Sequence, residues 1–229
     1  LIDIGTNGEI VLGNKEFLIS ASASAGPAFE GSGVSCGMRA SRGAIQKVKI
    51  TPGEFKVNYN TIGEVKPRGI CGSGYIDIIS EMLHCDLIDK SGKIKVRNCP
   101  RIRDSEFGKE FVVAFKEESD STSDIVITEA DIENIKRAKA AIFAATTILA
   151  RHMGFNFEEI KKIFIAGGFG NYIDIENAIY MGLLPDLERD KFVFVGNSSL
   201  AGARSALLSY EAMRKANDIA KKITYFELS

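Results

Sequence analysis

The chain has 229 residues and a formal net charge of −1 at neutral pH, with 45% hydrophobic and 26% charged residues. This composition is typical of a globular protein with a sizeable core and argues against extended disorder. The balanced charge gives no electrostatic basis for binding nucleic acid or an acidic membrane. No apolar stretch approaches the roughly 20 residues that span a bilayer, and no signal peptide is visible, so we expect a cytoplasmic protein.

The first 20 residues predict a β-meander. Its three strands are Leu1–Ile4, Glu9–Leu12 and Glu16–Ser20. The segments between them contain Asn7-Gly8 and Gly13-Asn14, which are frequent in tight turns.

Asp3 stands inside the first of these apolar strands. A buried carboxylate is costly unless it is paired or bound to a cation, so we expect Asp3 to have a partner such as Mg²⁺. The following Gly5 and Thr6 offer backbone amides and a hydroxyl, which suit phosphate oxygens. The alternative is an ordinary hairpin turn.

The middle of the chain, residues 44–128, reads as an elaboration containing β-hairpins. Strands are predicted at Ala44–Ile50 and Phe55–Tyr59, and a helix begins near Gly72-Ser73-Gly74. Free amides at a helix start attract anions, so Gly72, Ser73 and Gly74 are candidates for binding a cofactor. A helix start without a ligand is an equally good explanation of these three residues.

The second half alternates helices and strands, which predicts an α/β sheet. Thr128 to Asp131 fit a capping box that begins a helix ending near Met153. The strands Ile163–Ala166 and Phe192–Val195 lack polar alternation, so we expect both to be buried on two faces. We also expect one helix over Ser199–Arg214, with these residues facing inward: Leu200, Ala203, Leu207, Tyr210 and Met213.

The glycine turn after the strand Ile163–Ala166 is the second candidate site. Gly167 and Gly168 would let a ligand lie against bare backbone at the carboxyl end of a strand. The dinucleotide fingerprint GxGxxG and the Walker A pattern are both absent. A simple tight turn is the alternative here.

The cysteines and histidines give no sign of a metal or catalytic centre. The two histidines lack a partner for acid–base work and are interpreted as packing or surface residues. The four cysteines lack metal-ligand spacing and are interpreted as buried thiols. The residues in question are His84, His152, Cys36, Cys71, Cys85 and Cys99.

Several motifs together carry a resemblance to a known family. DIGTNGE resembles the second phosphate loop, IFIAGGFGNYID the adenosine motif, and SSLAGARSAL the second connecting helix of the acetate and sugar kinase, heat-shock chaperone and actin superfamily. AGPAFEG, GICGSGYIDII, AGGFGNYID, MGLLP, VGNSSLAGA and ITYFELS resemble the ATP-dependent reductive activators of corrinoid proteins. This resemblance spans essentially the whole chain.

The resemblance implies an α/β lobe of ribonuclease-H-like type, whose core sheet combines the strands of residues 1–20 with 161–166 and 192–195. It implies that Asp3 positions Mg²⁺, with Glu9 as a second acidic residue near the metal or the attacking water. These residues would face the nucleotide: Gly5, Thr6 and Asn7 at the phosphates, and Gly167, Gly168 and Phe169 at the adenosine. The resemblance further implies that ATP use drives the reduction of cobalt(II) corrinoid to cobalt(I).

The resemblance also implies further domains that lie outside residues 1–229. We expect residues 1–229 to be the second lobe of a two-lobed ATPase, and the first lobe and an amino-terminal [2Fe–2S] domain to belong to the longer parent. The isolated chain is then expected to be inactive, and a corrinoid protein to be the partner of a parent that could be a homodimer. Two alternatives stay open: a small-molecule kinase of the same superfamily, and a non-catalytic docking module for a corrinoid protein.

Overall fold

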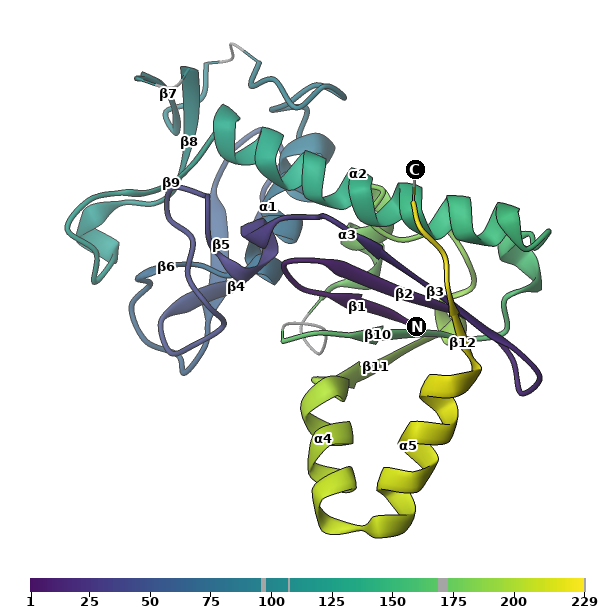
Figure 1. Cartoon of the computed structure of the whole chain (residues 1–229). Coiled ribbons are helices and arrows are strands. Elements are labelled where there is room, and N and C mark those ends of the chain that lie inside the picture. Colours follow the sequence, from purple (N-terminus) through teal and green to yellow (C-terminus); the bar gives the residue numbers. More distant parts are fainter. Residues whose placement is uncertain (96–97, 107, 169–172, 229) are drawn as a thin grey trace.

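The computed structural model describes every residue except 96, 97, 107, 169–172 and 229. A six-stranded mixed sheet runs through its centre in the order β11–β10–β1–β2–β3–β12 (Figure 1). The strands are β1 (Ile2–Ile4), β2 (Gly8–Gly13), β3 (Leu18–Ala23), β10 (Ile163–Ala166), β11 (Phe192–Gly196) and β12 (Ile223–Tyr225). The predicted combination of the first strands with two strands from the second half is therefore confirmed.

The pairing of these strands decides where their ends lie. β1 is antiparallel to β2 and parallel to β10, with Ile2 opposite Ile10 on one side and Ile165 on the other. β10 and β11 are also parallel. Because parallel neighbours end at the same edge of a sheet, the segments that leave β1, β10 and β11 emerge together.

The long helix α2 (Glu129–His152) crosses one face of the sheet over β2 and β3 (Figure 1). Ile4 and Ile10 are buried on the sheet, and Ile142 is buried on α2. A Cβ at Gly8 would lie only 2.7 Å from Cγ1 of Ile142, so the glycine lets the helix approach closely. Ala138 on the same helix is fully buried, so small residues also let the helix pack closely.

The start of α2 is held by more than a local cap. The Thr128 side chain accepts from the Asp131 amide, and Asp131 accepts from the Thr128 amide at 2.9 Å, which confirms the predicted capping box. Asp131 also accepts from the amide and the hydroxyl of Ser35, 96 positions earlier in the chain. The cap therefore also anchors the segment that contains Ser35.

Substitutions at this cap should separate its local and long-range parts. Thr128→Ala removes one capping acceptor and is expected to cost about 1 kcal/mol of unfolding free energy. Asp131→Ala leaves the buried Thr128 amide and the partly buried Ser35 amide without their acceptor, and is expected to cost about 3 kcal/mol. Urea denaturation of the two variants measures both values. Equal losses would contradict the long-range role of Asp131.

Residues 44–128 contain two further three-stranded sheets, with the orders β5–β4–β6 and β7–β8–β9. Their strands are β4 (Ala44–Ile50), β5 (Val57–Thr61), β6 (Gly69–Ile70), β7 (Ile102–Ser105), β8 (Gly108–Ala114) and β9 (Ile125–Thr128). Within this region the short helical turn η2 covers Lys116–Glu118. Two further short turns come later in the chain, η3 at Phe157–Glu159 and η5 at Arg189–Lys191. The predicted hairpin content of this region is confirmed.

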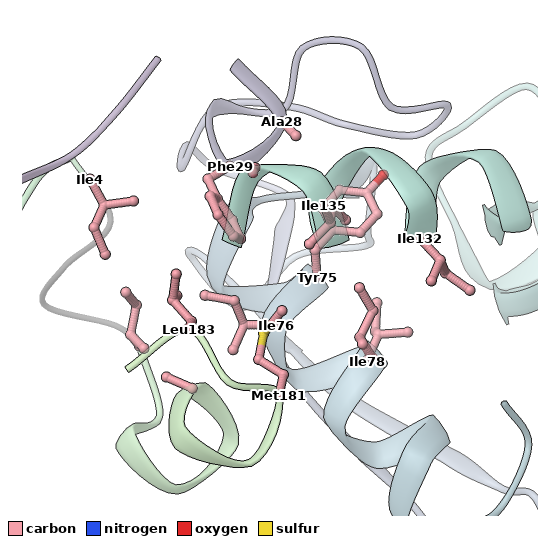
Figure 2. Packing of buried hydrophobic residues seen from close by; sticks show 14 of the residues in the cluster. Ile4, Ala28, Phe29, Tyr75, Ile76, Ile78, Ile132, Ile135, Met181 and Leu183 are labelled. Carbon is pink, nitrogen blue, oxygen red and sulfur yellow. The ribbon is translucent and has the colours of Figure 1, made fainter. Parts of the chain in front are cut away.

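Helix α1 (Gly72–His84) lies at the centre of the packing between these parts. Its buried face includes Tyr75, Ile76 and Ile78, which lie among side chains of α2, of the short helical turn η1 (Pro27–Glu30) and of the segment after α3 (Ile175–Tyr180) (Figure 2). Through α1, one continuous core joins the central sheet to the elaboration.

The predicted carboxy-terminal helix is wrong in two respects. The structure has two helices, α4 (Ser198–Leu208) and α5 (Tyr210–Lys222), because Ser209 is extended and its hydroxyl caps α5 by accepting from the Ala212 amide. The five side chains expected to face inward are exposed, with Leu207 and Tyr210 each 85% accessible. The two helices contact each other and extend away from the sheet on the side opposite α2 (Figure 1).

The expected two-sided burial of β10 and β11 is also wrong. Ile163 and Ile165 are buried, but Phe164 is 42% exposed and Val195 of β11 is 39% exposed. One face of these strands is covered by the core, and the other is open. Apolar residues on both faces of a strand predict burial without showing which part of a protein provides it.

The histidines and cysteines behave as packing residues. His84 stacks on Tyr180 with ring centroids 3.8 Å apart, and His152 lies against Phe226 at 4.2 Å. All four thiols are free, two of them buried and two half-buried. Within the described ranges, no helix is both long enough and apolar enough to cross a bilayer.

Candidate functional site

Three turns meet at the edge where β1, β10 and β11 end. They begin at Gly5, Gly167 and Asn197, each directly after its strand. The Gly167 amide donates to the Gly196 carbonyl at 3.1 Å, which joins the turns after β10 and β11. A Cβ on Gly167 would lie 2.4 Å from the Ile4 carbonyl oxygen, so the turn after β10 also touches the end of β1. Ligands of open α/β sheets bind at such edges.

Asp3 lies on the side of β1 opposite the buried Ile2 and Ile4. It is half-buried, so the prediction of a fully buried carboxylate is wrong; the alternation of the strand places it on the partly open face. Its Oδ2 accepts a hydrogen bond of 3.3 Å from the Ser199 hydroxyl at the start of α4. Glu9 is its direct partner on β2, and directly opposed residues share a face, so both carboxylates lie on this side of the sheet.

The turn after β1 carries a contact that sequence reasoning missed. The Thr6 hydroxyl donates to Oε2 of Glu30 at 2.8 Å, and the other carboxylate oxygen lies 3.2 Å from the place where a Cβ at Gly5 would stand. The Gly5 amide donates to the Asn7 carbonyl at 2.9 Å and closes the turn, with the Asn7 side chain exposed. Glu30 lies within the motif AGPAFEG, and an acidic residue at the end of a proline-led turn was the available signal.

The third predicted glycine turn, Gly72-Ser73-Gly74, is not an open loop at this edge. Gly72, Ser73 and Gly74 are buried at the start of α1, beneath η1. A Cβ at Gly72 would lie 2.1 Å from the Phe29 carbonyl oxygen, and one at Gly74 would lie 2.3 Å from that of Ile45. Backbone that already contacts protein has no room for a phosphate, so close packing accounts for these glycines and the geometry does not favour the cofactor role.

The adenosine turn is described only in part. Gly167 is buried with φ of 120°, a conformation open to glycine. Gly168 is exposed, and no atom lies within 4 Å of the place where a Cβ would stand. Phe169, the third predicted residue of this turn, lies outside the described residues.

The chemistry of the edge suits a phosphate that is bound together with a cation. The carboxylates of Asp3, Glu9 and Glu30 lie beside the hydroxyls of Thr6 and Ser199. The start of α4 adds free amides, apart from the Leu200 amide that the Asn197 side chain caps. Among the described residues no three His, Cys, Asp or Glu side chains are close enough to hold a metal alone. Mg²⁺ commonly uses one or two carboxylates with water and substrate phosphates, so the residues present fit a magnesium–nucleotide complex.

Comparisons with known proteins agree with the fold and the motifs. The family model described as "C-terminal domain of RACo the ASKHA domain" matches residues 1–229. A solved structure described as "Reductive activator for corrinoid,iron-sulfur protein" is 54% identical with a TM-score of 0.96, over 100% of this chain and 36% of that one. ASKHA denotes the acetate and sugar kinase, heat-shock chaperone and actin superfamily, so the predicted ribonuclease-H-like fold class is confirmed.

Two curated relatives are similar over nearly the whole chain. "Corrinoid activation enzyme RamQ" of Eubacterium limosum is 38% identical over 237 residues, which is 100% of this chain and 40% of that protein. "[Co(II) methylated amine-specific corrinoid protein] reductase" of Methanosarcina barkeri is 34% identical over 246 residues, 97% of this chain and 41% of that protein. The chain thus spans about two fifths of the curated relatives it matches. By its sequence and its structure, the chain belongs to the family of the carboxy-terminal ASKHA domain of RACo.

Proposed function

We propose that this chain is the second lobe of a nucleotide-binding ASKHA domain, within a longer reductive activator that uses ATP to restore cobalt(I) in a corrinoid protein. The observation that supports it best is the meeting of the Gly5, Gly167 and Asn197 turns beside Asp3 at one sheet edge. The relatives described as a corrinoid activation enzyme and a corrinoid protein reductase support the substrate class. The elaboration at residues 44–128, the first lobe and the [2Fe–2S] domain complete the proposed parent.

In this proposal each group at the edge has one task. Asp3 would hold Mg²⁺, with Glu9 near the metal or the attacking water, and Thr6 with the backbone of Gly5 and Asn7 would face the phosphates. Gly167 and Gly168 lie against the adenosine. Bound Mg²⁺ would neutralise charge on the phosphates. Phosphoryl transfer asks a protein mainly for such positioning, and a cleft built from two lobes explains why this lobe alone would be inactive.

Two other functions are possible in principle, of which one uses this sheet edge and the other does not. A small-molecule kinase of the superfamily would bind the same nucleotide and would release a phosphorylated product. A docking module would bind the corrinoid protein without using Asp3. The half-buried position of Asp3 and its bond to Ser199 favour a chemical role for this carboxylate over docking alone.

Asp3→Asn in the full-length protein tests the proposal. We expect ATP hydrolysis and cobalt(I) formation both to fall about 100-fold, because the isosteric amide cannot hold the cation. Cobalt(I) is followed by its absorbance, and binding of the corrinoid protein is measured separately and should not change. Asp104→Asn is the matched control, because Asp104 is an exposed strand carboxylate paired with Lys109.

Other outcomes decide between the alternatives. Full cobalt reduction by Asp3→Asn would leave only the docking role. A phosphorylated small molecule formed by the unmodified protein would identify a kinase.

A further inference from the structure

Glu30 places a carboxylate on the Thr6 hydroxyl, a side-chain donor of the loop that is proposed to hold phosphate. Thr6 has a single hydroxyl proton, and it points to Oε2 of Glu30 at 2.8 Å. The second carboxylate oxygen lies against Gly5, at 3.2 Å from the place of an absent Cβ. The carboxylate therefore covers both the hydroxyl and the backbone of the turn after β1.

The backbone of Glu30 is held in place from both sides. η1 begins at Pro27 and buries Ala28 and Phe29 in the core (Figure 2). Gly31 ends it in the left-handed conformation, with φ of 83°, and would place a Cβ only 2.5 Å from the Met38 amide nitrogen. The main chain on either side of Glu30 is packed, so only its side chain can yield when a ligand arrives.

A carboxylate at this place changes which anions can bind. A phosphate must compete with Glu30 for the Thr6 hydroxyl, and it meets a like charge at contact distance. Two like charges this close repel each other, and solvent weakens the repulsion only in part at a protein surface. Asp3 and Glu9 on the same edge add to this repulsion. A divalent cation on the phosphates turns the same carboxylates into favourable neighbours.

We propose that Glu30 determines the ligand specificity of this site: it excludes metal-free nucleotides and free phosphate anions and admits nucleotides complexed with a divalent cation. This inference rests on the proposed nucleotide site and adds a selecting residue to it. Glu30 acts through charge and through its hold on Thr6, whereas Asp3 faces the cation.

The test measures the affinity of the full-length protein for ATP in excess chelator and in Mg²⁺, by calorimetry. Glu30→Gln keeps an acceptor for Thr6 and removes only the charge. We expect its affinity for metal-free ATP to rise about tenfold, and its affinity for Mg–ATP to change less than about threefold. The ratio of the two affinities therefore falls. Glu16→Gln is the control, because Glu16 is an exposed carboxylate in the turn between β2 and β3, before the start of β3.

Three outcomes would overturn the inference. An unchanged ratio in Glu30→Gln would show that the carboxylate does not select the ligand. A tenfold loss of Mg–ATP affinity with metal-free binding unchanged would make Glu30 a metal ligand instead. If the unmodified protein bound ATP under neither condition, the proposed nucleotide site itself would fail.

Discussion

Gly167→Ala is expected to destabilise the 229-residue chain by about 3 kcal/mol, and Gly168→Ala to change its stability by less than about 1 kcal/mol. The two glycines are neighbours in one turn, but their surroundings differ. Gly167 is buried at φ of 120°, and a Cβ there would lie 2.4 Å from the Ile4 carbonyl oxygen. Gly168 has a conformation open to other residues, with nothing within 4 Å of an added Cβ.

The Gly167 substitution should also disturb the candidate site. Relieving the clash requires the ends of β1 and β10 to separate, and Gly5 follows directly after the end of β1. We therefore expect a loss of nucleotide affinity in the full-length Gly167→Ala variant that Gly168→Ala does not share. Urea denaturation followed by circular dichroism measures stability, and calorimetry measures binding. Equal stability of the two variants would contradict the close contact between these strand ends.

Asp77→Asn is expected to stabilise the chain by about 2 kcal/mol at pH 7 and to have no effect near pH 4. Asp77 is buried in α1, where it accepts from the Val48 amide at 3.1 Å and from the Asn177 side-chain amide at 2.7 Å. Burial outweighs these two hydrogen bonds and raises the pKa of Asp77 from the usual 3.8 to about 6. The charged form is therefore disfavoured in the folded chain.

The direction of the pH dependence follows from that raised pKa. Between about pH 4 and pH 6 the folded chain binds a proton that the unfolded chain does not, so the contribution of Asp77 to stability is present below pH 4 and is lost as the pH rises through 6. Asparagine is neutral throughout. If the side-chain amide of Asn177 rotates by about 180° in the variant, its oxygen accepts from the amide of residue 77 and its nitrogen donates to the Ser80 hydroxyl. In the unmodified chain that hydroxyl instead donates to the Asn177 oxygen, at 3.0 Å. All the hydrogen bonds of the network are then kept.

Glu81→Gln is the matched control, one helical turn further along α1. Glu81 accepts from the Ile50 amide at 2.9 Å and pairs with Lys49 at 2.6 Å, which raises the pKa of that lysine. A neutral amide loses this ion pair, so we expect a cost of about 1 kcal/mol at pH 7. Unfolding free energies of both variants and the unmodified chain from pH 4 to 8 test the prediction. A constant difference between Asp77→Asn and the unmodified chain would contradict it.

The local elements of this protein follow from its sequence. The Thr128–Asp131 cap, the meander of the first 20 residues and the helix that begins at Gly72 depend on residues a few positions apart, and all are present in the structure. The motifs DIGTNGE and AGGFGNYID also identified the family and its sheet. Short-range signals such as capping and periodicity survive because their partners are near in the chain.

Contacts between segments that are distant in the sequence depend on the tertiary structure. Thr6 meets Glu30 across 24 positions, Asp77 meets Asn177 across 100, and Asp3 meets Ser199 across 196. The apolar pattern of residues 199–214 likewise predicted an inward face without showing what covers it. In the structure the segment is divided at Ser209, and those apolar side chains are exposed. A periodic pattern records which side of an element is apolar, whereas the order and direction of the strands set which side chains meet. The sequence alone therefore determined the family and the elements that depend on near neighbours, but not the division of the last helix at Ser209. Strand order and direction brought Asp3, Thr6, Glu30 and Gly167 to one edge.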